Sequence, residues 1–106
     1  MIIVTDGDLK ELLTTGKNRR YKFIVQNKTL YNGLMQAVGI MKNAQTVEEL
    51  KQFSFLHYEK LKYEYSGLSS LRLSNRFVHR LIFEECEDTI TLKLIEIDDT
   101  HYGNKQ

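Results

Sequence analysis

The spacing of apolar residues predicts helices in the first half of the chain. The clearest pattern places an apolar residue at every third or fourth position, as on the buried face of a helix, and predicts a helix at about residues 28–43. The residues of this stripe, which we expect in the core, are Leu30, Leu34, Ala37, Val38 and Met41. At the start of the chain, "MIIVT" is apolar and β-branched and predicts a short strand.

Two shorter segments also have helical patterns. "DLKELLTTGK" predicts a helix with Asp8 as its N-cap and Gly16 at its end. "TVEELKQF" predicts another, in which Thr46 and Glu49 have the spacing of a capping box. Between the first of these helices and the long one, "KNRRYK" is expected to form a basic, exposed connection.

From Tyr58 onward, apolar and polar residues alternate as they do in strands. "GLSSLRLS", "FVHRLIFEE" and "TITLKLIEI" predict three strands joined by short polar turns. In the last segment Leu92 and Leu94 share one face. Ile95 and Ile97 share the other, so either both faces are covered or the strand has a bulge. The order of elements predicts an α+β fold, a small antiparallel sheet with the N-terminal helices on one face.

Length and composition fit a single domain spanning residues 1–106, with 42% hydrophobic residues. No apolar run approaches the roughly 18 residues of a membrane span, and "MIIVTDGD" lacks the pattern of a signal peptide. The lone Cys86 excludes an internal disulfide and fits a reducing cytoplasm, and its acidic neighbours disfavour a reactive thiolate. No Cys/His cluster has metal-ligand spacing, so we expect neither a metal nor another cofactor.

Charge is distributed unevenly along the chain. Residues 1–83 hold 13 Lys or Arg and 7 Asp or Glu, whereas residues 84–106 hold 2 and 7. A basic body is compatible with a polyanionic partner, but a solvated surface of mixed charge explains this modest excess equally well. The segment "LHYEKLKYEYSG" leaves the same choice, because its lysines and tyrosines suit either a solvated sheet edge or RNA phosphates and bases.

Two arginines are predicted to face each other in the sheet. In "SSLRLS" two leucines point one way, so Arg72 between them points the other. If the hairpin loop is Asn75-Arg76-Phe77, Arg72 lies directly opposite Arg80. Like charges in that position destabilise a sheet, so a stable pair indicates an anion between the two side chains. With another loop length, each arginine would instead pair with a surface carboxylate, and both alternatives remain open.

Six features of the second half occur in a recognisable order. They are Glu59, Leu61-Lys62, Ser66-Gly67, Arg72, His79-Arg80-Leu81-Ile82-Phe83 and His101-Tyr102. This order resembles the RelE-like bacterial toxins, in their HigB and YoeB branch. The resemblance covers about residues 44–103, and it extends to the first 43 residues only through the helix order and "TTGK". Ser69 departs from it, because an aromatic residue often stands there, and the hairpin is about two residues longer than in compact members.

The resemblance implies a toxin of a type II toxin–antitoxin system that enters the ribosomal A site and cleaves mRNA, with the 2′-hydroxyl as nucleophile. It implies that Glu59 is the base and that Arg80 stabilises the phosphate. His101 would be the acid, and Tyr102 would position the phosphate or stack on a base. The residues expected to bind RNA phosphates are Lys60, Lys62, Arg72 and Arg76.

This chemistry is consistent with the residue types. Cleavage by a 2′-hydroxyl needs a base, an acid and cations around the pentacoordinate phosphate, and it needs no metal. An imidazole with its ordinary pKa of about 6.5 suits proton transfer near neutrality. A carboxylate with its ordinary pKa of about 4.3 is a weak base, so the role of Glu59 requires partial desolvation or help from the ribosome.

The resemblance also implies partners. These are the ribosome, mRNA and a cognate antitoxin, expected to be a helix-turn-helix DNA-binding protein. Two alternatives are a non-enzymatic toxin of the same fold that poisons DNA gyrase and an inactive remnant that binds only its antitoxin. Glu59, Arg80 and His101 together favour the nuclease. Of the other histidines, His79 is expected to be structural and to point away from Arg80, and His57 is either a substrate contact or a loop residue.

Overall fold

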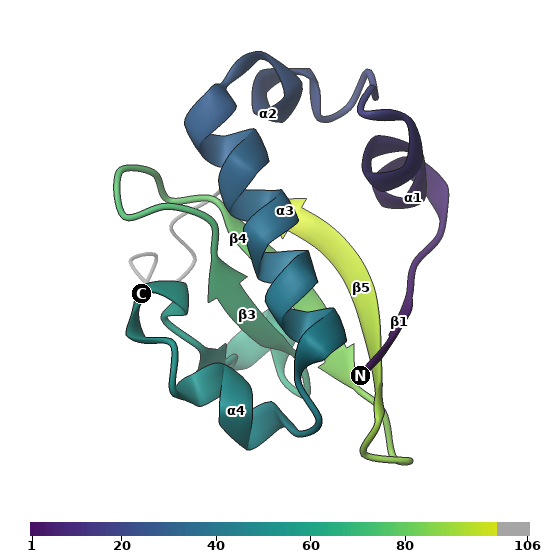
Figure 1. Ribbon diagram of the computed structural model, residues 1–106, viewed down its shortest axis with the longest axis vertical. Coiled ribbons are helices and arrows are strands. Elements are labelled where there is room, and N and C mark those ends of the chain that lie inside the picture. Colours follow the sequence, from purple (N-terminus) through teal and green to yellow (C-terminus); the bar gives the residue numbers. More distant parts are fainter. Residues whose placement is uncertain (100–106) are drawn as a thin grey trace.

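The computed structural model describes residues 1–99, and its helices pack on one face of a twisted sheet (Figure 1). The helices are α1 (Gly7–Thr15), α2 (Lys22–Gln26), α3 (Lys28–Asn43) and α4 (Val47–Lys51), with the 3-10 turns η1 (Ser54–Leu56) and η2 (Tyr63–Tyr65). The strands are β1 (Ile2–Val4), β2 (Glu59–Lys60), β3 (Ser69–Arg72), β4 (Arg80–Glu85) and β5 (Thr91–Asp98). No helix in this part of the chain is long and apolar enough to cross a membrane.

The strand order in the sheet is β1-β5-β4-β3-β2. Strands β2 to β5 pair antiparallel, as the alternating pattern predicts. Strand β1 joins the sheet at its other edge, where it pairs in parallel with β5. The sheet is therefore mixed rather than wholly antiparallel, because the helices between β1 and the meander carry the chain across one face before β2 begins.

Helix α3 spans the predicted residues and crosses the covered face of the sheet (Figure 1). All five residues of its predicted apolar stripe are buried. They pack with residues of α1, α2 and α4 against the inward-facing side chains of β3, β4 and β5. The predicted core of the N-terminal half is confirmed.

A β-bulge explains why β5 has apolar residues on both of its predicted faces. The register between β4 and β5 shifts between Ile82 and Phe83, so that Ile95 of β5 is not paired. Beyond the bulge, Ile97 is buried in the same core as Leu94, whereas Ile95 is 37% exposed. Of the two predicted alternatives, the bulge is correct.

The predicted helix caps are partly wrong. The N-cap of α1 is Asp6 rather than Asp8, which lies in the first turn and accepts a hydrogen bond from Asn18. Gly16 does end α1, in the left-handed conformation that favours glycine. Thr46 is the N-cap of α4, but its side chain makes no capping hydrogen bond, so the predicted capping box is absent.

The segment "KNRRYK" is anchored rather than wholly exposed. Tyr21 is buried, and its hydroxyl accepts a hydrogen bond from the backbone N–H of Ile97 in β5. Asn18 is also buried and donates to the carboxylates of Asp8 and Glu11. The chain then forms α2, which the sequence analysis did not predict. These contacts hold α2 beside the C-terminal end of β5.

Candidate active site

Arg72 of β3 and Arg80 of β4 are directly paired across the two strands. The predicted register is confirmed, and the alternative loop length is wrong. Directly opposite residues of an antiparallel pair point to the same face of the sheet. Both arginines therefore lie on the face away from the main core, because Leu71 and Leu81, which alternate with them, are buried in that core.

Glu59 joins the arginines from the edge strand β2. It pairs with Ser70, whose side chain lies on the same face of β3 as that of Arg72. One guanidinium nitrogen of Arg80, Nη1, donates to Oε1 of Glu59 at 2.6 Å. The Arg80 side chain is 20% exposed and the Glu59 side chain is 52% exposed. The structure therefore brings together a predicted base and a predicted phosphate ligand.

A row of charged residues crosses three neighbouring strands. Arg72 is followed by Arg80 on β4 and by the buried Asp98 on β5, which pairs with Arg80. Arg80 thus has a carboxylate neighbour on β5 in addition to its ion pair with Glu59. By contrast, the buried Nε of Arg72 has no hydrogen-bond partner among residues 1–99. An unpaired buried donor costs about 1–3 kcal/mol, so this N–H is an unmet hydrogen-bond donor beside the ion pair.

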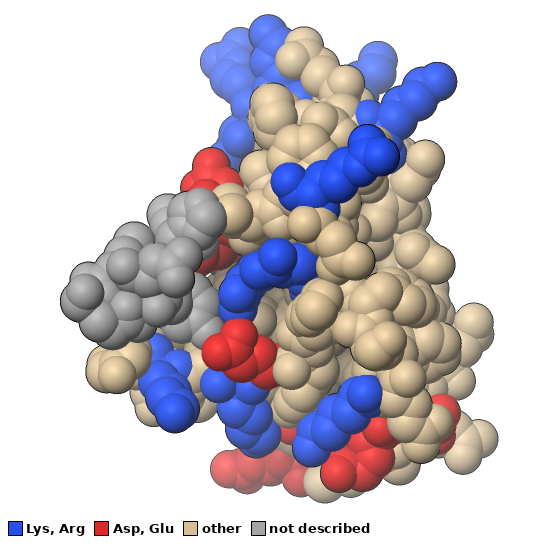
Figure 2. All heavy atoms as spheres, turned by 90° about the vertical axis from the view of Figure 1, so that its left-hand side faces the viewer, with Lys and Arg blue, Asp and Glu red and all other residues tan. Residues whose placement is uncertain are grey.

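The remaining predicted site residues are placed less closely. Lys60 follows Glu59 on β2 and so faces the other side of the sheet, where its Nζ lies 3.7 Å from Oε1 of Glu85. Lys62 and Arg76 are exposed. His101 and Tyr102 lie outside the described residues. Lys and Arg side chains are spread over one side of the molecule, with acidic side chains among them (Figure 2).

Two histidines flank the candidate site. His57 contacts Asn75 of the hairpin loop, with 3.0 Å between its Nε2 and the side-chain oxygen. His79 immediately precedes Arg80, and its ring stacks on that of Phe23 from α2. His79 is thus packed against the helical layer, in agreement with a structural placement, and burial lowers its pKa despite the opposing effect of Asp99 and Asp98.

Ser69 takes part in a partly buried hydrogen-bond network. It stands where the resemblance predicts an aromatic residue. Its hydroxyl donates to Oε2 of Glu85 at 2.6 Å, and the Tyr58 hydroxyl donates to the same oxygen. Burial and the Glu85 carboxylate raise the pKa of Tyr58 to about 12. Burial alone would raise the pKa of Glu85, but the hydrogen bonds from Ser69 and Tyr58 lower it below its ordinary value of 4.5. Ser69 therefore joins β3 to β4 and offers no stacking surface.

This network predicts a specific acid sensitivity. Because the pKa of Glu85 is lowered in the folded state, its ionised form stabilises the fold above pH 4.5, and this contribution is lost as the pH falls through the folded-state value. Glu85→Gln is expected to cost roughly 1–2 kcal/mol at neutral pH, because it weakens hydrogen bonds to a charged acceptor. In urea unfolding, the difference from the parent should shrink at more acid pH. The matched control is the exposed neighbour, Glu84→Gln, which should change little. An acid dependence unchanged by Glu85→Gln would contradict the prediction.

One feature next to the arginines was missed by the sequence analysis. Residues of α2 and of the end of β5 line a cavity that begins beside Arg80, because His79 and Asp98 are among its walls. The one residue in the sequence that could have indicated this cavity is Phe23, a large apolar residue in a basic segment. Within residues 1–99, no group of His, Cys, Asp and Glu is arranged to hold a metal ion.

Comparison with known proteins identifies the fold. No family profile and no curated protein matches the sequence. A chain of the YoeB-YefM complex from Staphylococcus aureus is 20% identical and has a TM-score of 0.55, with 96% of this chain and 98% of that chain covered. A second structure, of the heterotetrameric YoeB-YefM toxin-antitoxin complex from the same organism, is 19% identical, with a TM-score of 0.51 and the same coverage.

The chain has a RelE-like fold. More narrowly, it is the fold of the YoeB type, and the predicted fold class is confirmed.

Proposed function

We propose that the chain is a ribosome-dependent endoribonuclease, the toxin of a toxin–antitoxin pair, which cleaves mRNA by attack of its 2′-hydroxyl without a metal. One observation carries this proposal. Arg72 and Arg80 lie side by side on one face of the sheet, with the Glu59 carboxylate 2.6 Å from Arg80. Two cations and a carboxylate in this arrangement supply the phosphate ligands and the base that such a cleavage needs.

A phosphodiester fits the arginine pair. The repulsion between directly opposite guanidinium groups is relieved when an anion lies between them. Arginine presents a planar set of donors that matches the oxygens of a phosphate. A phosphate at this position competes with Glu59 for Arg80. Binding of RNA would therefore release the carboxylate from its ion pair at the moment when it is needed as a base.

The proposed reaction uses Glu59, Arg72, Arg80, Lys62 and His101. Glu59 takes the proton of the 2′-hydroxyl, and a bond forms between the 2′-oxygen and phosphorus. Arg72, Arg80 and Lys62 stabilise the added negative charge of the pentacoordinate phosphate. The bond from phosphorus to the 5′-oxygen breaks, and His101 protonates that oxygen. The products are a 2′,3′-cyclic phosphate and a 5′-hydroxyl.

Exposure of the base supports dependence on the ribosome. A carboxylate becomes a stronger base when water is excluded from it. The Glu59 side chain is 52% exposed in the free chain, so the chain alone supplies little of this desolvation. We propose that the ribosomal A site and the bound message supply the rest, and that naked RNA is cut weakly or not at all.

The proposed partner is a cognate antitoxin in the cytoplasm. Two solved structures that share the fold are complexes of YoeB with YefM, and one of them is named a toxin-antitoxin complex. The resemblance to the HigB branch supports an antitoxin that is a helix-turn-helix DNA-binding protein. A small DNA-binding protein encoded beside this chain is the expected finding.

The proposal is tested by the chemistry of the cut ends. Purified chain is mixed with ribosomes carrying mRNA in the A site, and the same mRNA without ribosomes is the control. We expect cleavage in the A-site codon, with 2′,3′-cyclic phosphate and 5′-hydroxyl ends. A 2′-deoxy nucleotide on the 5′ side of the cut should abolish cleavage. Ends bearing a 5′-phosphate would contradict the mechanism, because they arise from attack by water.

His101→Gln is expected to slow cleavage by about 100-fold, because a general acid contributes roughly 10²- to 10⁴-fold. Single-turnover cleavage of ribosome-bound mRNA measures this loss. The loss should be smaller on a substrate whose 5′-oxygen is replaced by sulfur, since a thiolate leaves without protonation. An equal loss on both substrates would show that His101 is not the acid.

A further inference from the structure

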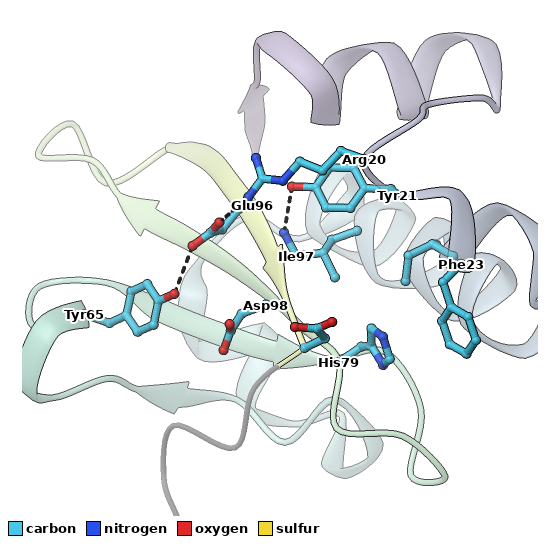
Figure 3. A pocket seen from close by; sticks show the side chains of 10 residues that line it. Arg20, Tyr21, Phe23, Tyr65, His79, Glu96, Ile97 and Asp98 are labelled. Carbon is cyan, nitrogen blue, oxygen red and sulfur yellow. Dashed lines mark hydrogen bonds and ion pairs between the residues drawn. The ribbon is translucent and has the colours of Figure 1, made fainter. Parts of the chain in front are cut away.

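A cavity of about 210 Å³ lies between α2 and the end of β5 (Figure 3). His79 and Asp98 both line this cavity. His79 directly precedes Arg80 in the chain, and Asp98 is the cross-strand partner of Arg80. Neighbouring strands are about 4.8 Å apart, so the cavity begins within one nucleotide's length of Arg80. A group bound there can belong to the same RNA chain as a phosphate at the arginines.

One side of the cavity is aromatic. The rings of Phe23 and His79 are stacked, with centroids 5.6 Å apart and planes 16° from parallel. Phe77 supports both rings edge-on, at 6.2 Å from Phe23 and 5.9 Å from His79. Phe23 is nevertheless 54% exposed, although phenylalanine is usually buried. An exposed ring that its neighbours hold in place is a suitable platform for a planar aromatic ligand.

The opposite side of the cavity is lined by carboxylates. Glu96 accepts hydrogen bonds from Arg20 at 2.7 Å and from the Tyr65 hydroxyl at 3.0 Å, which fix its position (Figure 3). Asp98 is buried in the same wall. Carboxylates repel phosphate and accept hydrogen bonds from N–H groups. This wall therefore admits a neutral group with N–H donors and leaves the phosphate to the arginines.

We propose that this cavity is a base pocket, which binds one RNA nucleobase next to the phosphate held by Arg72 and Arg80, and that it prefers adenine, guanine or cytosine to uracil. Adenine, guanine and cytosine carry an exocyclic amino group that can donate to a carboxylate, whereas uracil has none. The volume is below the roughly 300–1,000 Å³ of pockets for drug-sized ligands and suits a single ring system. The inference rests on the proposed function, because that function supplies the RNA.

A cationic side chain of a protein partner is the competing occupant. One feature favours the base. Arg20 is paired with Glu96, but Asp98 and Asp99 also line the cavity, so its charge would suit a cation as well. The stacked rings of Phe23 and His79 present a flat surface, which a planar base covers more completely than a flexible side chain does.

Direct titration tests the pocket without depending on catalysis. The four ribonucleoside 3′-monophosphates are added to the free chain at millimolar concentrations, and the ring protons of Phe23 and His79 are followed by NMR. We expect those signals to shift with AMP, GMP and CMP, and UMP to bind at least about fivefold more weakly. Equal affinity for all four nucleotides, or no shift at these rings, would overturn the inference even if the chain cleaves mRNA.

Substitution of Phe23 gives the second test. Loss of a stacking ring weakens base binding roughly 5- to 150-fold, so Phe23→Ala should reduce both nucleotide binding and cleavage of ribosome-bound mRNA by at least fivefold. Phe23→Tyr, which keeps the ring, should restore both. The matched control is Phe53→Ala, because Phe53 is another half-exposed phenylalanine and lies outside the cavity; it should leave both unchanged.

The outcomes separate the pocket from the proposed function. Nucleotide binding lost in Phe23→Ala, with no RNA cleavage by the parent chain, would keep the pocket and refute the nuclease. Cleavage that needs Arg80 but is indifferent to Phe23 would keep the nuclease and refute the pocket. If Phe23→Ala weakens binding of the antitoxin while nucleotide binding is unchanged, the cavity is a peptide site and the inference is wrong.

Discussion

Arg80→Ala is expected to reduce cleavage of ribosome-bound mRNA by at least about 100-fold and to abolish growth inhibition on induced expression. Removal of one donor to a transition-state oxyanion typically costs 10²- to 10³-fold, and Arg80 is placed to donate to the phosphate from the centre of the charged row. Single-turnover cleavage and a growth assay measure the two effects. The exposed Arg19 provides the matched control, because Arg19→Ala removes the same charge and Arg19 belongs neither to the charged row nor to the lining of the cavity.

A loss of folding must be distinguished from a loss of chemistry in this variant. Arg80 is 20% exposed and lies beside the buried Asp98, so its removal takes a cation away from the neighbourhood of that carboxylate. Arg80→Lys keeps the charge and loses only the planar fork of donors. We expect this variant to unfold at nearly the parental urea concentration and still to cleave at least about tenfold more slowly. If Arg80→Ala and His101→Gln both still inhibit growth, the chain acts by binding rather than by cleavage.

The pairing of the two arginines was predictable because it depends on local chemistry. The alternation of leucine with polar residues places Arg72 on one face of β3. The hairpin loop then determines which residue of β4 faces it, and the polar stretch between the strands limits that loop to a few lengths. The ion pair between Glu59 and Arg80 could not be derived in the same way, because β2 has only two residues and its register depends on tertiary contacts.

There is a physical reason why helix α2 and the base pocket could not be predicted from the sequence. "KFIVQ" is five residues long and contains three consecutive apolar residues, so its pattern does not distinguish a helix from a strand. Its position depends on the buried Tyr21, whose hydroxyl reaches the backbone of Ile97, which lies 76 residues away in the sequence. This long-range contact, together with the packing of Ile24 in the core, brings Phe23 to His79. Local patterns carry no information about such a convergence.

Gly33→Ala is expected to destabilise the fold by about 3 kcal/mol, at the upper end of the usual cost of overpacking. Helix α3 crosses the sheet so closely that a Cβ at position 33 would lie 1.9 Å from the backbone oxygen of Leu73. This atom belongs to the backbone, so it cannot move away by a change of rotamer. The helix must shift, or the strand end must. Equilibrium urea unfolding of the variant and the parent measures the cost.

The same helix provides the matched control. A Cβ at Gly39 would meet nothing within 4 Å, so Gly39→Ala is expected to stabilise the fold by about 0.5–1 kcal/mol through its helix propensity. Leu73 follows Arg72, and its N–H donates to the carbonyl of His79 at 3.2 Å, one residue before Arg80. Displacement of Leu73 in the Gly33→Ala variant should therefore also alter the spacing of the arginines and slow cleavage, although position 33 lies on the opposite face of the sheet. Parental stability and cleavage in Gly33→Ala would mean that α3 does not hold this strand end in place.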